Sequence, residues 1–158
     1  MFARILIPTD GSKLAEKASR AAVELAKSEG ASVVGFHALP SYEKSAYQTV
    51  AISPGWITEE DFDKFNQRAA KKYLGTIEKL AHEAGVPYEA YTLTQKHPAL
   101  AIVEAVENKR CDLIFMGSHG RGDLAQVFLG SVTTKVLSLC STPVLVYRSG
   151  PGKARKRK

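Results

Sequence analysis

A glycine-punctuated segment, 117–122 (GSHGRG), is followed by a second short motif, Gly130-Ser131, at the start of an expected helix. Glycines let backbone N–H groups approach an anion because no Cβ stands in the way. The amino terminus of a helix adds unpaired N–H groups and a favourable dipole, and the Ser131 hydroxyl would supply one more donor. These residue types predict a phosphate-binding loop, although the same glycines could serve only to turn the chain.

The loop follows neither of two widespread phosphate-binding patterns. It lacks the GxxxxGK[ST] sequence of P-loop nucleoside triphosphatases. It also lacks the GxGxxG sequence of dinucleotide-binding dehydrogenases. Both functions are therefore disfavoured.

The sequence offers no evident catalytic constellation, which would need a positioned acid, base or nucleophile. His119 lies in the glycine-rich segment without an evident aspartate or nucleophile partner, and the other histidines are scattered. The HxGH and SGGxDS sequences of nucleotidyl transferases and ATP pyrophosphatases do not occur. Binding is therefore predicted ahead of catalysis, with an ATP hydrolase or phosphotransferase kept as the alternative.

Short apolar runs alternate with longer amphipathic stretches, which is typical of βαβ units and a parallel sheet. Ser12 and Thr58 are expected to begin two helices as N-caps, and Gly30 and Gly85 to end them. The second of these helices is expected to bury one face that runs from Phe62 and Phe65 to Ala84. A third helix is expected from His97-Pro98 and a fourth after Gly130-Ser131, and strands at 3–8, 32–39, 86–93, 112–116 and 143–147. Residues 40–57 show no clear period and are expected to form a long loop.

Five strands and four helices in this order predict a doubly wound, Rossmann-like α/β domain with helices on both faces of a parallel sheet. In such sheets a ligand binds beyond the carboxyl ends of the strands, where the strand order reverses. The expected site therefore comprises residues 9–12 and the segment from Gly117 onward. The length of 158 residues suits one domain of this kind.

The spacing Gly117-x2-Gly120-x9-Gly130-Ser131 resembles the nucleotide-binding signature G-x2-G-x9-G-[S/T] of the universal stress protein family. The segments 5–12 (ILIPTDGS) and 142–146 (TPVLV) look like the first and last strands of that family. The resemblance covers residues 1–148. It implies ATP bound at the switch point, a regulatory or signalling role in the stress response, and a homodimer paired through the last strand, Val144 to Tyr147.

The resemblance also implies roles for individual residues. Asp10 would lie near the ribose or adenine, although it could instead be only a turn or cap carboxylate. Ala38 falls where many members have valine, whose backbone contacts adenine. Pro8 and Thr9 would also line the pocket, and Met116 and Gly117 would flank the base or ribose. The phosphates would be contacted through the backbone amides of Gly120, Gly130, Ser131, Val132 and, more weakly, Thr133.

One departure from the family pattern lies in the glycine-rich loop. Many relatives have a small residue and then glycine after Gly120-Arg121, whereas this chain has Gly122-Asp123. A carboxylate close to a triphosphate would repel it unless the side chain points away or holds a divalent cation such as Mg²⁺. Arg121 could offset phosphate charge, or it could be a solvated loop arginine.

The formal net charge of +6 is concentrated at the carboxyl end. Residues 153–158 (KARKRK) hold five of the 22 lysines and arginines, so residues 1–152 carry 17 basic against 16 acidic side chains, a net charge of +1. Residues 149–158 are expected to form a disordered tail after a domain spanning 1–148. Binding of nucleic acid or another anionic surface through this tail is a further alternative, without base stacking because no aromatic residue is interleaved with the charges.

Composition disfavours membrane-spanning, secreted and zinc-ribbon proteins. No apolar run approaches the ~20 residues of a membrane-spanning helix, and no signal peptide is apparent. Cys111 and Cys140 have neither a CxxC spacing nor a nearby histidine, which excludes a cysteine-rich zinc ribbon. This cysteine usage favours a reducing, cytoplasmic location.

Overall fold

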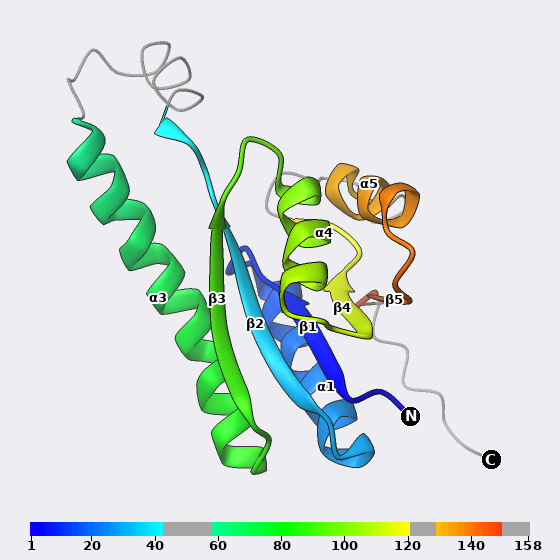
Figure 1. Ribbon diagram of the computed structural model, residues 1–158. Helices are drawn as coiled ribbons and strands as arrows, with labels where there is room; N and C mark the ends of the chain where they lie inside the picture. Colours follow the sequence, from blue (N-terminus) through cyan, green and yellow to red (C-terminus); the bar gives the residue numbers. More distant parts are fainter. Residues whose placement is uncertain (43–57, 121–128, 150–158) are drawn as a thin grey trace.

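The computed structural model describes residues 1–42, 58–120 and 129–149. In chain order the elements are β1 (Arg4–Pro8), α1 (Lys13–Glu29), β2 (Ser32–Leu39), α3 (Glu59–Ala84), β3 (Tyr88–Thr94), α4 (Pro98–Asn108), β4 (Leu113–Gly117), α5 (Ser131–Leu139) and β5 (Val144–Tyr147) (Figure 1). All five strands run parallel, in the order β3-β2-β1-β4-β5. The predicted doubly wound sheet is confirmed, while most of the expected long loop at 40–57 lies outside the described residues.

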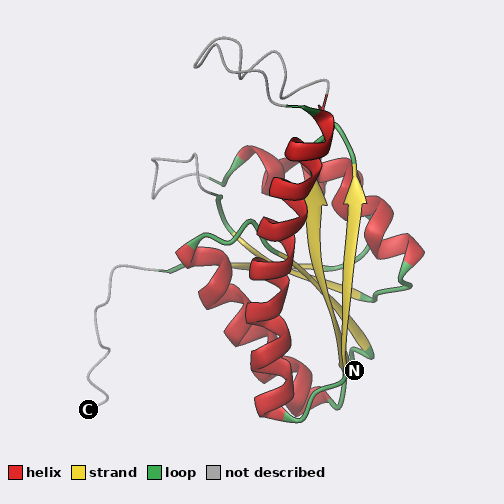
Figure 2. Cartoon of the chain, turned by 90° about the vertical axis from the view of Figure 1, so that its left-hand side faces the viewer, coloured by secondary structure: helices red, strands yellow, loops and turns green. Residues whose placement is uncertain are grey.

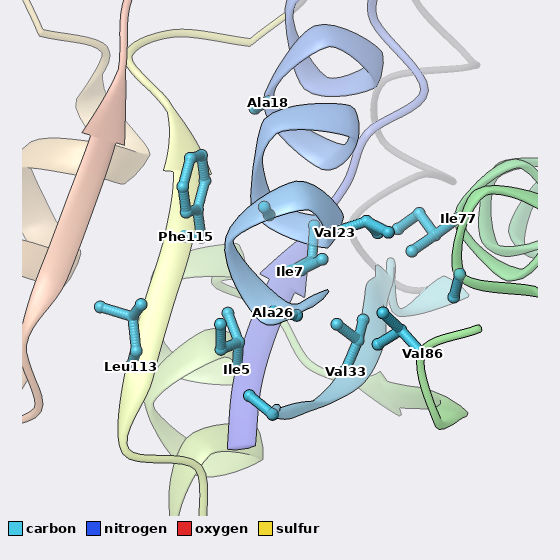
Figure 3. Close-up of a cluster of buried hydrophobic side chains, with 13 residues drawn as sticks. Ile5, Ile7, Ala18, Val23, Ala26, Val33, Ile77, Val86, Leu113 and Phe115 are labelled. Atoms are coloured by element: carbon cyan, nitrogen blue, oxygen red, sulfur yellow. The ribbon is translucent and has the colours of Figure 1, made fainter. Parts of the chain in front are cut away.

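Helices cover both faces of this sheet, whose right-handed twist is visible in Figure 2. Successive side chains of a strand point to opposite faces. In β1, Ile5 and Ile7 belong to a core shared with α1 and α3, which Figure 3 shows, whereas Leu6 belongs to a core shared with α4 and α5. Because both faces are covered, interior strands such as β4 (LIFMG) are apolar at consecutive positions.

The helix ends follow the predicted capping residues. The Ser12 hydroxyl accepts a hydrogen bond from the N–H three residues on at 3.2 Å, and the Thr58 hydroxyl does the same at 3.1 Å. Gly30 and Gly85 end α1 and α3 in the left-handed conformation, with φ of 68° and 70°. Pro98 opens α4. These local signals therefore placed the starts of three helices and the ends of two to within a residue.

The prediction for the buried face of α3 was wrong at Phe65. Phe65 is 71% exposed, and the buried positions of the helix are Ala70, Leu74, Ile77 and Ala81. Figure 1 shows the first turns of α3 leaning away from the strands. An apolar helical period therefore does not reveal where along its length a helix meets the sheet.

Glu89 of β3 is held between two cations. It pairs with Arg4 of β1, and the Lys109 Nζ atom lies 2.5 Å from its Oε1 atom. The hydrogen bond from Lys109, aided by the charges of Lys109 and Arg4, lowers the pKa of Glu89 below the ordinary 4.5. Since the pKa is lower in the folded state, this contribution to stability is present above pH 4.5 and is lost as the pH falls below that value.

Replacing Glu89 by glutamine is expected to lower the free energy of unfolding at pH 7 by less than about 1 kcal/mol, because the side chain is 41% exposed and solvent screens its charge. The variant should also lose less stability than the wild type between pH 7 and pH 4. Urea unfolding at the two pH values measures both effects. Glu83→Gln is the control, since Glu83 and Lys79 are exposed and 3.9 Å apart; equal losses in the two variants would contradict a special role for Glu89.

No helix in the described part of the chain is long and apolar enough to cross a membrane. Cys111 is buried, Cys140 is half-buried, and both are free thiols. Apart from Ser149, the basic tail lies outside the described residues. The domain boundary at 148 and the disorder of 149–158 therefore stay predictions.

Candidate functional site

A cavity of about 360 Å³ lies beyond the carboxyl ends of the strands, where the strand order reverses. The chain proceeds from β1 to β2 on one side of the sheet, whereas β4 neighbours β1 on the other. The segments that follow β1 and β4 therefore border the same space. Its volume lies in the range of small-molecule sites, roughly 300–1,000 Å³.

The turn after β1 forms one side of the cavity. The Thr9 hydroxyl accepts a hydrogen bond from the N–H of Gly11 at 3.1 Å, and the Asp10 Oδ1 atom accepts one from the N–H of Ser12 at 2.9 Å. Short polar side chains commonly close turns onto their own backbone in this way. Asp10 is thus a turn carboxylate that also lines the cavity, so closing the turn is compatible with a place in the ligand site.

The loop after β4 approaches this turn at Gly120. A Cβ atom placed on Gly120 would lie 2.8 Å from the Asp10 Oδ2 atom, which is closer than real Cβ contacts come. The backbone of Gly120 therefore lies directly against the carboxylate. The absence of a side chain at Gly120 lets the two loops meet at the edge of the cavity.

Two hydrogen bonds fix the start of α5 beside the end of β4. The N–H of Gly130 donates to the carbonyl of Ser118 at 2.7 Å, and the Thr133 hydroxyl donates to the carbonyl of Gly117 at 3.0 Å. Thr133 is buried, so its hydroxyl serves this contact. The first N–H groups of any α-helix lack acceptors within the helix. In α5 these N–H groups belong to residues 131–133, which line the cavity. They suit an anion, as does the positive end of the helix dipole.

Apolar residues form the rest of the wall. Phe36 of β2 and Met116 of β4 are buried, and Ile102 is contributed by α4. Ala38 also lines the cavity, and its single methyl group covers less of the wall than valine would. A surface of this kind suits the faces of an aromatic base.

The described lining residues carry little charge. Asp10 is the sole carboxylate among them, and they include no lysine or arginine. Within the described ranges, no group of three or more histidines, cysteines or acidic residues could hold a metal ion. Anion binding by these residues would therefore depend on backbone N–H groups. Arg121, Gly122 and Asp123, the segment that departs from the family pattern, lie outside the described residues.

The structure brings together eleven of the twelve residues predicted for the site. They lie in four separate segments of the chain and all line the cavity: Pro8, Thr9, Asp10, Ala38, Met116, Gly117, Gly120, Gly130, Ser131, Val132 and Thr133. Arg121 is the twelfth. That these residues contact a ligand stays a prediction.

Six lining residues were not in the predicted set: Ala15, Phe36, His37, Pro98, Ile102 and His119. Phe36 and His37 directly precede Ala38, so the end of the second strand could have indicated them. Pro98 and Ile102 reach the cavity only because of how α4 packs on the sheet, and no local pattern reveals that packing. His119 lies between Gly117 and Gly120, so its neighbours in the sequence could have indicated it.

Ser118 and His119 form a hydroxyl–imidazole pair, with 3.0 Å between Ser118 Oγ and His119 Nδ1. Such a pair is the starting point of an activated nucleophile. Ser118 is, however, only 2% exposed and does not line the cavity. Its hydroxyl is therefore placed to support the loop, not to attack a ligand in this cavity.

Residues 1–148 match the model of the universal stress protein family. The chain is 36% identical over 152 residues to a universal stress protein of Thermus aquaticus, covering 94% of this chain and 100% of that one. It is 33% identical over 149 residues to the universal stress protein MJ0531 of Methanocaldococcus jannaschii, covering 94% and 83%.

Solved structures share the fold. The hypothetical protein MJ0577 superposes with a TM-score of 0.78 at 27% identity, over 96% of this chain and 99% of that one. A universal stress protein in complex with cAMP has a TM-score of 0.69 at 21% identity, over 94% and 99% of the two chains. One from Archaeoglobus fulgidus in complex with dAMP has a TM-score of 0.66 at 23% identity, over 91% and 96%.

Proposed function

This chain belongs to the universal stress protein family, and from that premise we propose that it binds ATP between the turn after β1 and the start of α5 and acts as a regulatory or signalling module in the stress response. The observation that carries the proposal is that Asp10 and the first turn of α5 line one cavity at the switch point of the sheet. Proteins of this fold in complexes with cAMP and dAMP support adenine nucleotides as the ligand class.

Each part of the nucleotide has a matching surface. The adenine would lie against the apolar wall near Phe36 and Ala38, where the end of β2 also presents backbone groups. The ribose hydroxyls would donate to the Asp10 carboxylate, a strong acceptor. The phosphates would accept hydrogen bonds from the N–H groups of residues 131–133 and from the loop at Gly120.

Mg²⁺ would accompany the phosphates in this arrangement. Because Asp10 is the sole carboxylate among the described lining residues, the ion would be held mainly by phosphate oxygens and water. Mg²⁺ would then offset the repulsion between Asp10 and the phosphates. Affinity for ATP should accordingly be higher with Mg²⁺ than with a chelator present.

Native mass spectrometry of the purified protein tests the proposal, because it detects any ATP, ADP or AMP that copurifies. Calorimetric titration of nucleotide-free protein with ATP, with and without Mg²⁺, gives the affinity. Saturable binding at one site per chain is the expected result. Neither copurified nucleotide nor saturable binding of ATP, ADP or AMP would overturn the proposal.

Binding is proposed ahead of turnover because the Ser118 hydroxyl is buried outside the cavity wall. A dedicated ATPase or phosphotransferase would reach turnover numbers of about 1 s⁻¹ or more. We expect only a few turnovers per hour, measured as phosphate released from ATP. Turnover on the enzymatic scale would favour the alternative.

A homodimer paired through β5 is part of the same proposal. β5 lies at one edge of the sheet, Leu145 within it is 38% exposed, and Leu137 and Leu139 of α5 are exposed as well. An apolar edge strand invites pairing with a second copy. Light scattering after size exclusion should give twice the chain mass.

The proposed location is the cytoplasm. The two free thiols, Cys111 and Cys140, suit its reducing conditions.

A further inference from the structure

The turn that carries Asp10 is tied to β2 by both backbone groups of Thr9. The N–H of Thr9 donates to the carbonyl of Phe36 at 2.9 Å. The carbonyl of Thr9 lies 2.7 Å from the Nδ1 atom of His37. Because a carbonyl oxygen only accepts, Nδ1 carries the proton and donates it. The hydrogen bond from His37 thus links the turn after β1 to β2 just beyond the last backbone hydrogen bond between the two strands.

The His37 ring lies on the face of the sheet opposite the apolar wall. Along β2, Val34 and Phe36 pack with α4, whereas Val33 packs with α1 and α3. His37 follows the same alternation as Val33, and its ring makes an edge-to-face contact with Tyr73 of α3 at 5.3 Å between centroids. His37 lines the cavity as well, but its ring holds the Asp10 turn from the side of β2 that faces α3.

Tyr73 supports the turn from the same side. Gly11 has a φ of 73°, and a Cβ atom placed on it would lie 2.3 Å from two atoms of the Tyr73 ring. The ring thus lies directly on the Gly11 backbone. His37 and Tyr73, which contact each other, hold Thr9 and Gly11, the two neighbours of Asp10.

A small space lies beside this support. It measures about 110 Å³ and is lined by Thr9, Gly11 and Tyr73 together with further residues of α1 and α3, most of them polar. Thr9 also lines the larger cavity, so it separates the two spaces. The hydrogen bond from His37 opposes movement of Thr9 away from its place in the wall.

We infer that His37 is a positioning residue. Its hydrogen bond to the Thr9 carbonyl, supported by Tyr73, keeps the Asp10 carboxylate where it accepts ribose hydroxyls and so sets the preference for ribonucleotides over 2′-deoxyribonucleotides. This inference rests on the proposed nucleotide binding. His37 would act on the nucleotide through this bond, because its ring packs against Tyr73 of α3.

A first experiment works on the ligand-free protein. The N–H groups of Gly11 and Ser12 donate to the side chains of Thr9 and Asp10, so their hydrogen exchange reports the order of the turn. His37→Phe keeps a ring against Tyr73 but removes the donor, and should speed exchange of both amides by about tenfold. His37→Asn, whose side-chain amide donates from a similar position, should restore slow exchange. His82→Phe, at an exposed position of α3, is the matched control.

Unchanged exchange at Gly11 and Ser12 in His37→Phe would overturn the positioning role. So would a general rise in exchange across the strands, because it would mean that the ring only stabilises the fold. This readout does not depend on a nucleotide. It therefore decides the role of His37 even if the wild type binds none.

A second experiment compares AMP with 2′-deoxy-AMP by calorimetry. The wild type should bind AMP more tightly than 2′-deoxy-AMP. His37→Phe should lose about tenfold in affinity for AMP but little for 2′-deoxy-AMP, so that the ratio of the two affinities approaches one. His37→Asn should keep the wild-type ratio. Equal losses for both nucleotides, or a wild type without preference, would overturn the role in ribose selection. A wild type that binds neither would overturn the proposed function itself.

Discussion

Replacing Gly120 by valine is expected to weaken adenine-nucleotide binding by about a hundredfold while leaving the fold intact. The Cβ atom alone would lie 2.8 Å from the Asp10 Oδ2 atom, so either the carboxylate or the loop must move. Hydrogen bonds to a charged group contribute about 1.5–3 kcal/mol each, and displacement of Asp10 would remove them from the ribose. The valine methyl groups would also occupy the edge of the cavity. Gly120 is exposed, so the cores on the two faces of the sheet should be unaffected.

A double-mutant cycle shows whether the valine acts through Asp10. Asp10→Ala should lose much of the affinity by itself, and Gly120→Val should add far less in that background than in the wild type. Gly75→Ala is the control, because a Cβ there meets no atom within 4 Å. ATP affinity is measured by calorimetry and helical content by circular dichroism. Wild-type affinity in Gly120→Val would contradict the proposed place of the nucleotide.

Helix ends were predictable because their signals are local. Ser12 and Thr58 each bond to a backbone N–H three residues later, and Gly30 and Gly85 adopt a conformation that other residues rarely tolerate. Each of these features depends only on the neighbouring few residues. Interior strands such as β4 were predictable for a related reason, since a strand covered on both faces shows a continuous apolar run.

Packing between distant elements was not predictable in the same way. Phe65 fits the apolar period of its helix, yet it is exposed because the first turns of α3 lean away from the sheet. Tyr73, in contrast, lies on Gly11, which precedes it by 62 positions. No spacing within either segment indicates that contact, because it depends on how α3 crosses the sheet.

The candidate site was predictable in part. Its glycines and Asp10 were indicated by the resemblance to a family, which records positions that folding brings together. The sequence does not indicate His37, because a lone histidine in a strand has no local partner there. Its partner, the Thr9 carbonyl, belongs to a neighbouring strand end, and every residue has such a carbonyl. Backbone contacts of this kind leave no residue-specific signal.

The Gly11→Ala variant is expected to lose about 2–4 kcal/mol of unfolding free energy, a large effect for a single methyl group. Two costs combine in this variant. A φ of 73° disfavours any residue with a Cβ by about 1 kcal/mol, and the added atom would lie 2.3 Å from the Tyr73 ring. The ring cannot withdraw easily, because it packs edge to face on His37.

Gly30→Ala separates the two costs, because Gly30 has nearly the same φ, 68°, but open space around its Cβ position. It should lose only about 1 kcal/mol in urea unfolding, the cost of the backbone conformation alone. Combining Gly11→Ala with Tyr73→Ala removes the ring, so in that background the Gly11 change should cost no more than Gly30→Ala does. If Gly11→Ala and Gly30→Ala were equally stable in the wild-type background, Tyr73 would not press on the turn. The support for Asp10 would then come from His37 alone, and α3 would have no part in holding the nucleotide site.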